Sequence, residues 1–233
     1  MHGLLAMSQS KEESDVDQKR FVYGLVVALF FAFIMIVAKM VETLEHISLV
    51  RLGIHPRSIA GLWGILTSPF VHGDWGHLFS NITSFTALMV ALLYFYKGVA
   101  YRVFFGIYIF SGLFVWAFGR ESWHIGSSGL IYGMAAFLFF SGIVRQYIPL
   151  MAISLIVAFL YGSMVWGIFP LAIHLPYSWE AHLGGTIAGI LLAVLFRASG
   201  PQKPKKVWDE DDPEADESDR YWEIDGKVGH DTT

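Results

Sequence analysis

Six long apolar segments alternate with polar stretches along the chain. A helix needs roughly 20 apolar residues to cross the ~30 Å hydrocarbon core of a bilayer. The pattern therefore predicts an all-α integral membrane protein in which residues 21–196 form six transmembrane helices in one bundle. The expected spans are Phe21–Met40, Leu78–Tyr96, Tyr101–Phe118, Gly129–Val144, Tyr147–Trp166 and Tyr177–Phe196.

The charged residues lie mainly outside these segments. The polar N-terminal tail, residues 1–20, holds 7 charged side chains and the acidic C-terminal tail, residues 197–233, holds 17, so only 12 of 36 fall between them. A soluble globular chain carries about 25% charged residues throughout. This distribution excludes nucleic-acid binding as a reading of the whole chain, and the C-terminal tail is too polar to form a core, so we expect it to be disordered.

The chain contains no cysteine. Disulfides, thiolate catalysis and cysteine-ligated metals are therefore excluded.

The distribution of Lys and Arg near the span ends predicts the orientation. Cytoplasmic segments are enriched in these residues. Ten of them face the cytoplasm if the N-terminus does, against four on the other side. We therefore expect both termini in the cytoplasm, in what we interpret as a prokaryotic plasma membrane. The outward segments are then Val41–Gly76, Gly119–Ser127 and Gly167–Pro176.

Polar side chains gather near the starts of three spans. In this orientation the second, fourth and sixth helices all run inward, so their first residues share the outer half of the membrane. Polar groups at such depth are energetically costly and mark candidate functional sites. The residues concerned are His72, His77 and Asn81 at the start of the second helix, Ser127 and Ser128 at the fourth, and His182 in the sixth.

Glycine spacing indicates that two of these helices pack closely. The fourth and sixth each carry a GxxxG pattern, which lets two helix backbones approach in lipid. Ser128 directly precedes the first pattern, and His182 lies three residues before the second, on the same helical face. Close packing would join a hydroxyl to an imidazole, the minimum for nucleophilic catalysis. The glycines are Gly129 and Gly133 in the fourth helix and Gly185 and Gly189 in the sixth.

Each feature also has a simpler interpretation. A serine before a helix is commonly an N-cap, glycine pairs often serve packing alone, and a histidine at a span end can be an interfacial residue. A metal site built from His72, His77 and His182 is a further alternative. However, His72 and His77 are five residues apart rather than the four that a helical zinc pair requires, and no HExxH motif occurs. We expect no metal and no cofactor.

Three motifs fall on the second, fourth and sixth expected helices. They read GLWGILTSPFVHGDWGHLFSN at residues 61–81, GSSG at 126–129 and AHLGG at 181–185. Together and in this order they resemble the rhomboid family of intramembrane serine proteases. The resemblance extends over residues 54–196.

The resemblance implies a role for each residue. The nucleophile of the GxSG motif, which begins at Gly126, falls on Ser128, and the general base falls on His182. His77 and Asn81 match the side chains of the oxyanion site. His72 matches a structural or water-organising residue, and Tyr132 matches the aromatic ring against which the catalytic imidazole packs. The resemblance assigns no role to Trp179 or Glu180, which lie just before His182.

The implied activity is hydrolysis of peptide bonds in or beside the transmembrane segments of membrane protein substrates, by a Ser-His dyad in contact with lipid. The uncharged loop Gly167–Tyr177 is expected either to cover the site as a flap or to be an ordinary interfacial loop. Two other functions remain open. A catalytically silent relative would bind transmembrane helices without cutting them, and a small ion or solute transporter would use the same polar cluster.

Overall fold

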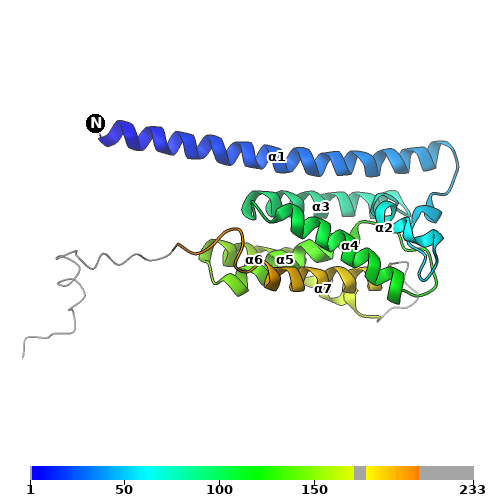
Figure 1. The fold of residues 1–233 in the computed structure, drawn as a ribbon. Coiled ribbons are helices and arrows are strands. Elements are labelled where there is room, and N and C mark those ends of the chain that lie inside the picture. Colours follow the sequence, from blue (N-terminus) through cyan, green and yellow to red (C-terminus); the bar gives the residue numbers. More distant parts are fainter. Residues whose placement is uncertain (1, 171–176, 205–233) are drawn as a thin grey trace, which may run out of the picture. The chain divides into compact units, whose positions relative to one another are not determined.

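The structure, a computed structural model, describes residues 2–170 and 177–204, with side chains from residue 14 onward. The acidic tail from residue 205 on, and six residues of the expected flap, 171–176, lie outside the described residues. The described part is helical, and its one strand-like feature is an isolated antiparallel bridge between Ile54 and His124. The α-helices (Figure 1) are α1 (His2–Leu44), α2 (Gly64–Thr67), α3 (Trp75–Phe95), α4 (Ala100–Phe118), α5 (Ser128–Arg145), α6 (Ile148–Tyr161) and α7 (Trp179–Leu195).

Five helical segments are long and apolar enough to cross a membrane, so the chain is a multi-pass integral membrane protein. The sixth expected span corresponds to α7, which is apolar but has only 17 residues. Large apolar side chains such as Phe159 and Phe118 are exposed on the outside of the bundle. Lipid tails are the solvent in which such a surface is stable. The five segments are Ser14–Leu44, Trp75–Phe95, Ala100–Phe118, Ser128–Arg145 and Ile148–Ile168.

Helix boundaries differ from the sequence expectation at three places. Helix α1 begins at His2, so it includes the polar tail that we expected to precede it. Helix α3 begins at Trp75 because the Asp74 side chain accepts a hydrogen bond from the His77 N–H at 2.8 Å, an N-cap. His72, expected at the start of this helix, lies in the loop before it. The fifth expected span changes to a 3₁₀ helix, Gly162–Ile168, after α6 ends.

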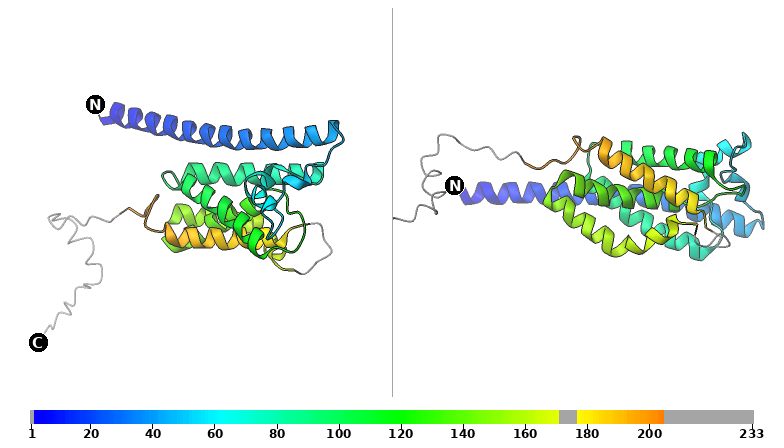
Figure 2. Two further views of the ribbon diagram at one scale, coloured as in Figure 1. Left: turned by 45° about the vertical axis from the view of Figure 1, so that its right-hand side comes forward. Right: turned by 90° about the horizontal axis from the view of Figure 1, so that it is seen from below.

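Helix α5 is the centre of the bundle. It packs against α7, α6, α3 and α4, and both views of Figure 2 show α5 and α7 side by side. Fully buried rings of Tyr96, Phe85, Phe104 and Phe137 fill the core. The helix that begins at Ser128 is thus the most enclosed of the described elements.

Helix α1 is tied to the start of α3. The buried Lys39 ammonium group donates hydrogen bonds to the carbonyl oxygens of His72 at 3.1 Å and Gly73 at 2.8 Å. It also pairs with Glu42 at 2.7 Å. These bonds satisfy a cation that would otherwise be costly to bury, and they fix the loop that leads into α3.

Candidate active site

Glycines bring α5 and α7 into backbone contact. A Cβ on Gly185 would overlap the carbonyl oxygen of Gly129, and a Cβ on Gly189 would overlap that of Gly133. Only glycine permits so close an approach. The two GxxxG patterns therefore face each other, and the residues at the start of the contact, Ser128 and His182, meet.

Ser128 and His182 form a hydrogen-bonded pair. The distance from Ser128 Oγ to His182 Nε2 is 2.9 Å. Ser128 is the first residue of α5, and the His182 side chain is 6% exposed, so the pair lies at the mouth of a buried region. This is the nucleophile and base geometry that hydroxyl catalysis requires.

The second nitrogen of His182 defines the tautomer of the ring. Nδ1 lies 2.9 Å from the carbonyl oxygen of Gly167, in the 3₁₀ helix. A carbonyl oxygen only accepts, so Nδ1 carries the proton. In the neutral ring Nε2 is then the acceptor, and Ser128 donates its hydroxyl proton to it. The Gly167 carbonyl thus contacts the ring nitrogen that faces a carboxylate in a Ser-His-Asp triad.

Two aromatic rings lie parallel to the His182 imidazole. Tyr132, one turn beyond Ser128 on α5, stacks on it with centroids 4.0 Å apart and planes 5° apart. Tyr177 lies at 5.8 Å and 16°. A Cβ on Gly167 would overlap the Tyr132 hydroxyl and lie 3.2 Å from His182 Nδ1. The ring, the imidazole and the main chain at Gly167 therefore occupy one tightly packed stack.

His77 and Asn81 lie beside the loop that leads to Ser128. Asn81 Nδ2 is 3.0 Å from His77 Nε2, so the two residues are one turn apart on α3 and hydrogen-bonded. Gly126 has φ +101°, and a Cβ there would be 3.0 Å from the His77 ring and 3.5 Å from Asn81 Nδ2. The backbone N–H of Ser128, at the first position of α5, has no acceptor within the helix. Polar groups from two helices thus lie beside the loop that leads to Ser128.

His72 is close to this cluster but does not join the dyad. Its ring is 5.1 Å from the His77 ring, is 1% exposed, and neither nitrogen has a partner among the described residues. Burial, with a smaller contribution from the charge on His77, lowers the pKa of His72 to about 4. The imidazole is therefore neutral near pH 7.

Comparison with known proteins identifies the family. The family model described as a rhomboid domain matches residues 60–199, more than half of the chain. The chain belongs to the rhomboid family. It is 32% identical to an uncharacterized protein of Mycobacterium tuberculosis over 191 residues, covering 77% of this chain and 78% of that protein. It is 31% identical to an uncharacterized protein of Mycobacterium leprae over 199 residues, covering 81% and 78%.

A polar network at the start of α7 in this rhomboid was not predicted from the sequence. Glu180 is 1% exposed, and its Oε1 accepts a hydrogen bond from the Arg120 N–H at 3.1 Å. The Arg120 guanidinium donates to the Tyr177 carbonyl at 2.8 Å. Its Nε is 3.8 Å from Glu180 Oε1. Glu180 therefore joins the helix that carries His182 to the segment 119–127, which leads to Ser128.

His124 extends this rhomboid network. Its Nε2 lies 2.9 Å from the Arg120 carbonyl oxygen, so Nε2 donates and Nδ1 accepts from the Ser178 hydroxyl at 2.6 Å. Ser178 Oγ in turn accepts from the Ala181 N–H at 3.2 Å and caps α7. Burial lowers the pKa of His124, which favours this neutral form. One hydrogen-bond chain thus runs from the loop before Ser128 to the first turn of the helix that carries His182.

The geometry bears on two alternative roles, a serine that caps α5 and a metal site built from histidines. Ser127, buried completely, occupies the N-cap position of α5 but makes no capping bond, and its hydroxyl has no partner in the described ranges. Within residues 14–170 and 177–204, no three His, Asp or Glu side chains gather as metal ligands would. Among the described residues, the hydroxyl that contacts His182 is that of Ser128.

Proposed function

We propose that the protein is an intramembrane serine endopeptidase that hydrolyses peptide bonds in or next to the transmembrane segments of other membrane proteins. The observation that carries the proposal is the orientation of one ring. His182 holds its proton on Nδ1 against Gly167 and presents Nε2 to the Ser128 hydroxyl at 2.9 Å. A dyad in this protonation state is ready for general-base catalysis.

In the proposed reaction Ser128 Oγ attacks the carbonyl carbon of the scissile peptide bond as His182 Nε2 takes the hydroxyl proton. The tetrahedral intermediate collapses when His182 gives that proton to the leaving nitrogen. This step releases the new amino terminus and leaves an ester on Ser128. A water molecule, deprotonated by His182, then hydrolyses the ester and regenerates the hydroxyl.

The negative charge that develops on the carbonyl oxygen needs donors at fixed positions. Asn81 has two amide protons, and the hydrogen bond with His77 occupies one of its N–H groups when the amide is oriented as given. The other N–H and the Ser128 main-chain N–H are the proposed oxyanion donors, and His77, whose Nε2 accepts from Asn81, supports the site by orienting that amide. Donors held rigidly by two helices stabilise such charge without reorganising.

The location of the dyad bears on the substrate. It lies at the end of the bundle where α3, α5 and α7 begin (Figure 1), which the Lys and Arg distribution predicts to be the outer side of the membrane. A helical substrate hides its carbonyl groups in intrahelical hydrogen bonds. It must therefore unwind before attack, and segments with small or helix-breaking residues near the outer boundary should be cut best.

The test is cleavage of a tagged single-span protein with small residues near its outer boundary. Wild-type protein in detergent would be compared with Ser128→Ala and His182→Ala by mass spectrometry of the products. Ser127→Ala is the matched control, because it removes the adjacent hydroxyl that has no partner in the described structure. We expect cleavage by wild type and Ser127→Ala only.

Equal cleavage by the Ser128→Ala protein would refute the dyad. If no folded variant cut any of several substrates, two non-proteolytic functions would replace the proposal. Retained binding of the single-span protein would favour the catalytically silent relative, and solute uptake into vesicles would favour the transporter.

A further inference from the structure

A cavity lies at the opposite end of the helices from the dyad. It has a volume of about 400 Å³ and is lined by α1 and by the turn that joins α3 to α4. Residues near Arg20 on α1 form one wall, and residues near Lys97, at the end of α3, form the other. The first turns of α1 extend past this turn (Figure 1). The cavity therefore opens where the membrane-embedded part of α1 meets its polar part.

The charged side chains that line this cavity are all cationic. They are Lys19, Arg20, Lys97 and Arg102. The nearby carboxylate of Asp17 is not part of the lining. It pairs with Arg20 Nη1 at 3.2 Å, but both side chains are about half exposed, so this ion pair offsets little of the positive charge of the cavity. The cavity is therefore a concentrated positive site.

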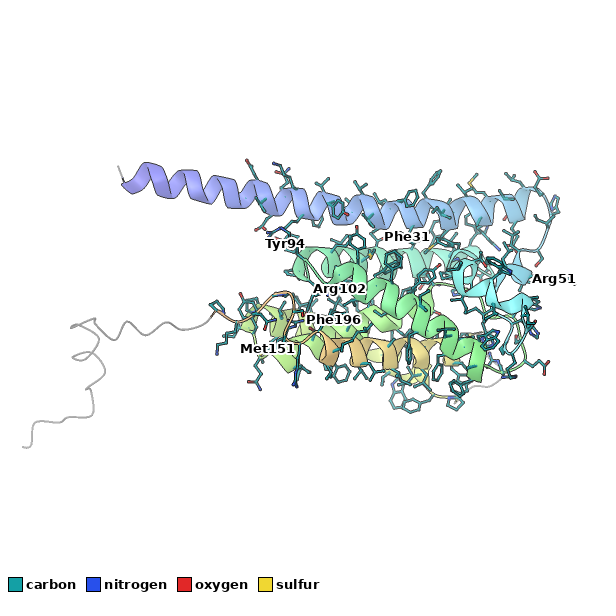
Figure 3. The ribbon with its side chains drawn as sticks, viewed as in Figure 1. Phe31, Arg51, Tyr94, Arg102, Met151 and Phe196 are labelled. Carbon is teal, nitrogen blue, oxygen red and sulfur yellow. The ribbon has the colours of Figure 1, made fainter. Side chains whose placement is uncertain are left out.

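Several of these cations keep hydrogen-bond donors free. In the described structure the ammonium groups of Lys19 and Lys97 make no hydrogen bond or ion pair, and the buried Nε of Arg20 has no acceptor. Arg102 is held in place: Nη2 donates to the Gly98 carbonyl at 2.8 Å, and the guanidinium lies 5.0 Å from the ring centre of Phe196. Arg102 and Phe196 lie near each other in Figure 3. Donors from three elements thus remain available to one anion.

The rest of the lining is apolar. It includes Val16, the buried Leu93 and the rings of Tyr23 and Tyr101. The two tyrosine hydroxyls hydrogen-bond to each other, which leaves the faces of their rings for apolar contact. A free phosphate ion would use only the cationic part of such a cavity. A phosphate joined to acyl chains would use both parts.

We propose that this cavity binds the headgroup phosphate of an anionic phospholipid and so joins α1 to the α3–α4 turn. The expected orientation places it at the cytoplasmic leaflet. Basic pockets between helices at that surface are suited to anionic lipid. The site is separate from the dyad, and the proposal does not depend on proteolysis.

The test uses the full chain, purified in a neutral detergent, and native mass spectrometry to measure lipid binding. Phosphatidylglycerol, phosphatidylcholine and glycerol 3-phosphate would be titrated separately. The test variant is Lys19→Gln with Lys97→Gln, since these side chains make no contact that the fold requires. The control is Arg197→Gln with Lys203→Gln, which removes two exposed cations from the same expected membrane side.

The proposal expects phosphatidylglycerol to bind more tightly than phosphatidylcholine and glycerol 3-phosphate to bind weakly. The Lys19→Gln, Lys97→Gln protein should bind phosphatidylglycerol about thirtyfold more weakly, from the usual contribution of two interfacial cations. The control should change less than threefold, and melting temperatures would establish that both variants are folded.

Three results would overturn the proposal. Equal affinity for the two lipids would show that charge is not recognised. Equal losses in both double variants would indicate a general surface effect rather than this cavity. Tight binding of glycerol 3-phosphate would indicate a site for a free phosphate compound.

Discussion

Replacing Gly167 with alanine tests whether the main chain orients the catalytic base. The added Cβ would overlap the hydroxyl of Tyr132 and lie 3.1 Å from Cζ of the same ring and 3.2 Å from His182 Nδ1. Tyr132 cannot withdraw without leaving the stack at 4.0 Å from the imidazole. Either that stack opens, or Gly167 retreats from the ring.

The size of the effect follows from the hydrogen bond between Gly167 and His182. A retreat of about 1 Å lengthens the 2.9 Å contact beyond hydrogen-bond range, which frees the imidazole to rotate. Misplacement of a catalytic group by that amount costs roughly 10²-fold in rate. We therefore expect kcat of the Gly167→Ala protein to fall about 100-fold, with little change in KM.

The assay is cleavage of the single-span substrate at several concentrations, with kcat and KM measured separately. Gly162→Ala is the matched control, because it lies in the same 3₁₀ helix and its Cβ would have nothing within 4 Å. Both proteins should have melting temperatures close to the wild type. If Gly167→Ala cleaved as fast as Gly162→Ala, the carbonyl would have no orienting role.

Three other substitutions test separate parts of the site. Asn81→Ala should lower kcat by about 10²–10³-fold, as loss of one oxyanion donor does, and unchanged kcat in a kinetic assay would exclude that role. Glu180→Gln should lower the unfolding free energy by about 1–3 kcal/mol and reduce kcat more than KM rises, whereas the exposed neighbour Glu121→Gln should change neither. Because burial lowers the pKa of His72 from 6.5 to about 4, the unfolded chain binds the proton more readily. The contribution of neutral His72 to the free energy of unfolding is complete above pH 6.5. About 3 kcal/mol of it is lost as the pH falls toward 4. Melting temperatures across this range should fall less steeply for His72→Phe than for wild type.

The pairing of Ser128 with His182 was predictable because its determinants are local in the sequence. The glycine spacing on two apolar segments indicates a close contact, and the topology gives both residues the same depth. Asp74, three residues before His77, is a sequence signal for the N-cap of α3. The apolar pattern alone predicted a helix start at Leu78, which is too late. The proposed roles of these residues remain predictions until activity is measured.

Other parts of the site depend on contacts that local sequence patterns do not predict. The contact of Gly167 with His182 is made by a main-chain oxygen. Every residue has such an oxygen, so the residue type at position 167 does not predict a hydrogen-bond acceptor. Glu180 was visible as a carboxylate at a span end, but its partner Arg120 lies 60 residues earlier. The change from α6 to a 3₁₀ helix occurs at Gly162 inside a continuous apolar run, where hydropathy cannot distinguish one helix type from another.

The use of a main-chain oxygen beside His182 has a genetic consequence. A catalytic aspartate can be lost through a single base change in its codon, but no codon change removes a carbonyl group from the polypeptide. A mutation at position 167 can change only the volume of the side chain next to this carbonyl group. The inherited constraint there is therefore on size, so every missense substitution of this glycine, including the most conservative, is expected to be harmful for the same steric reason.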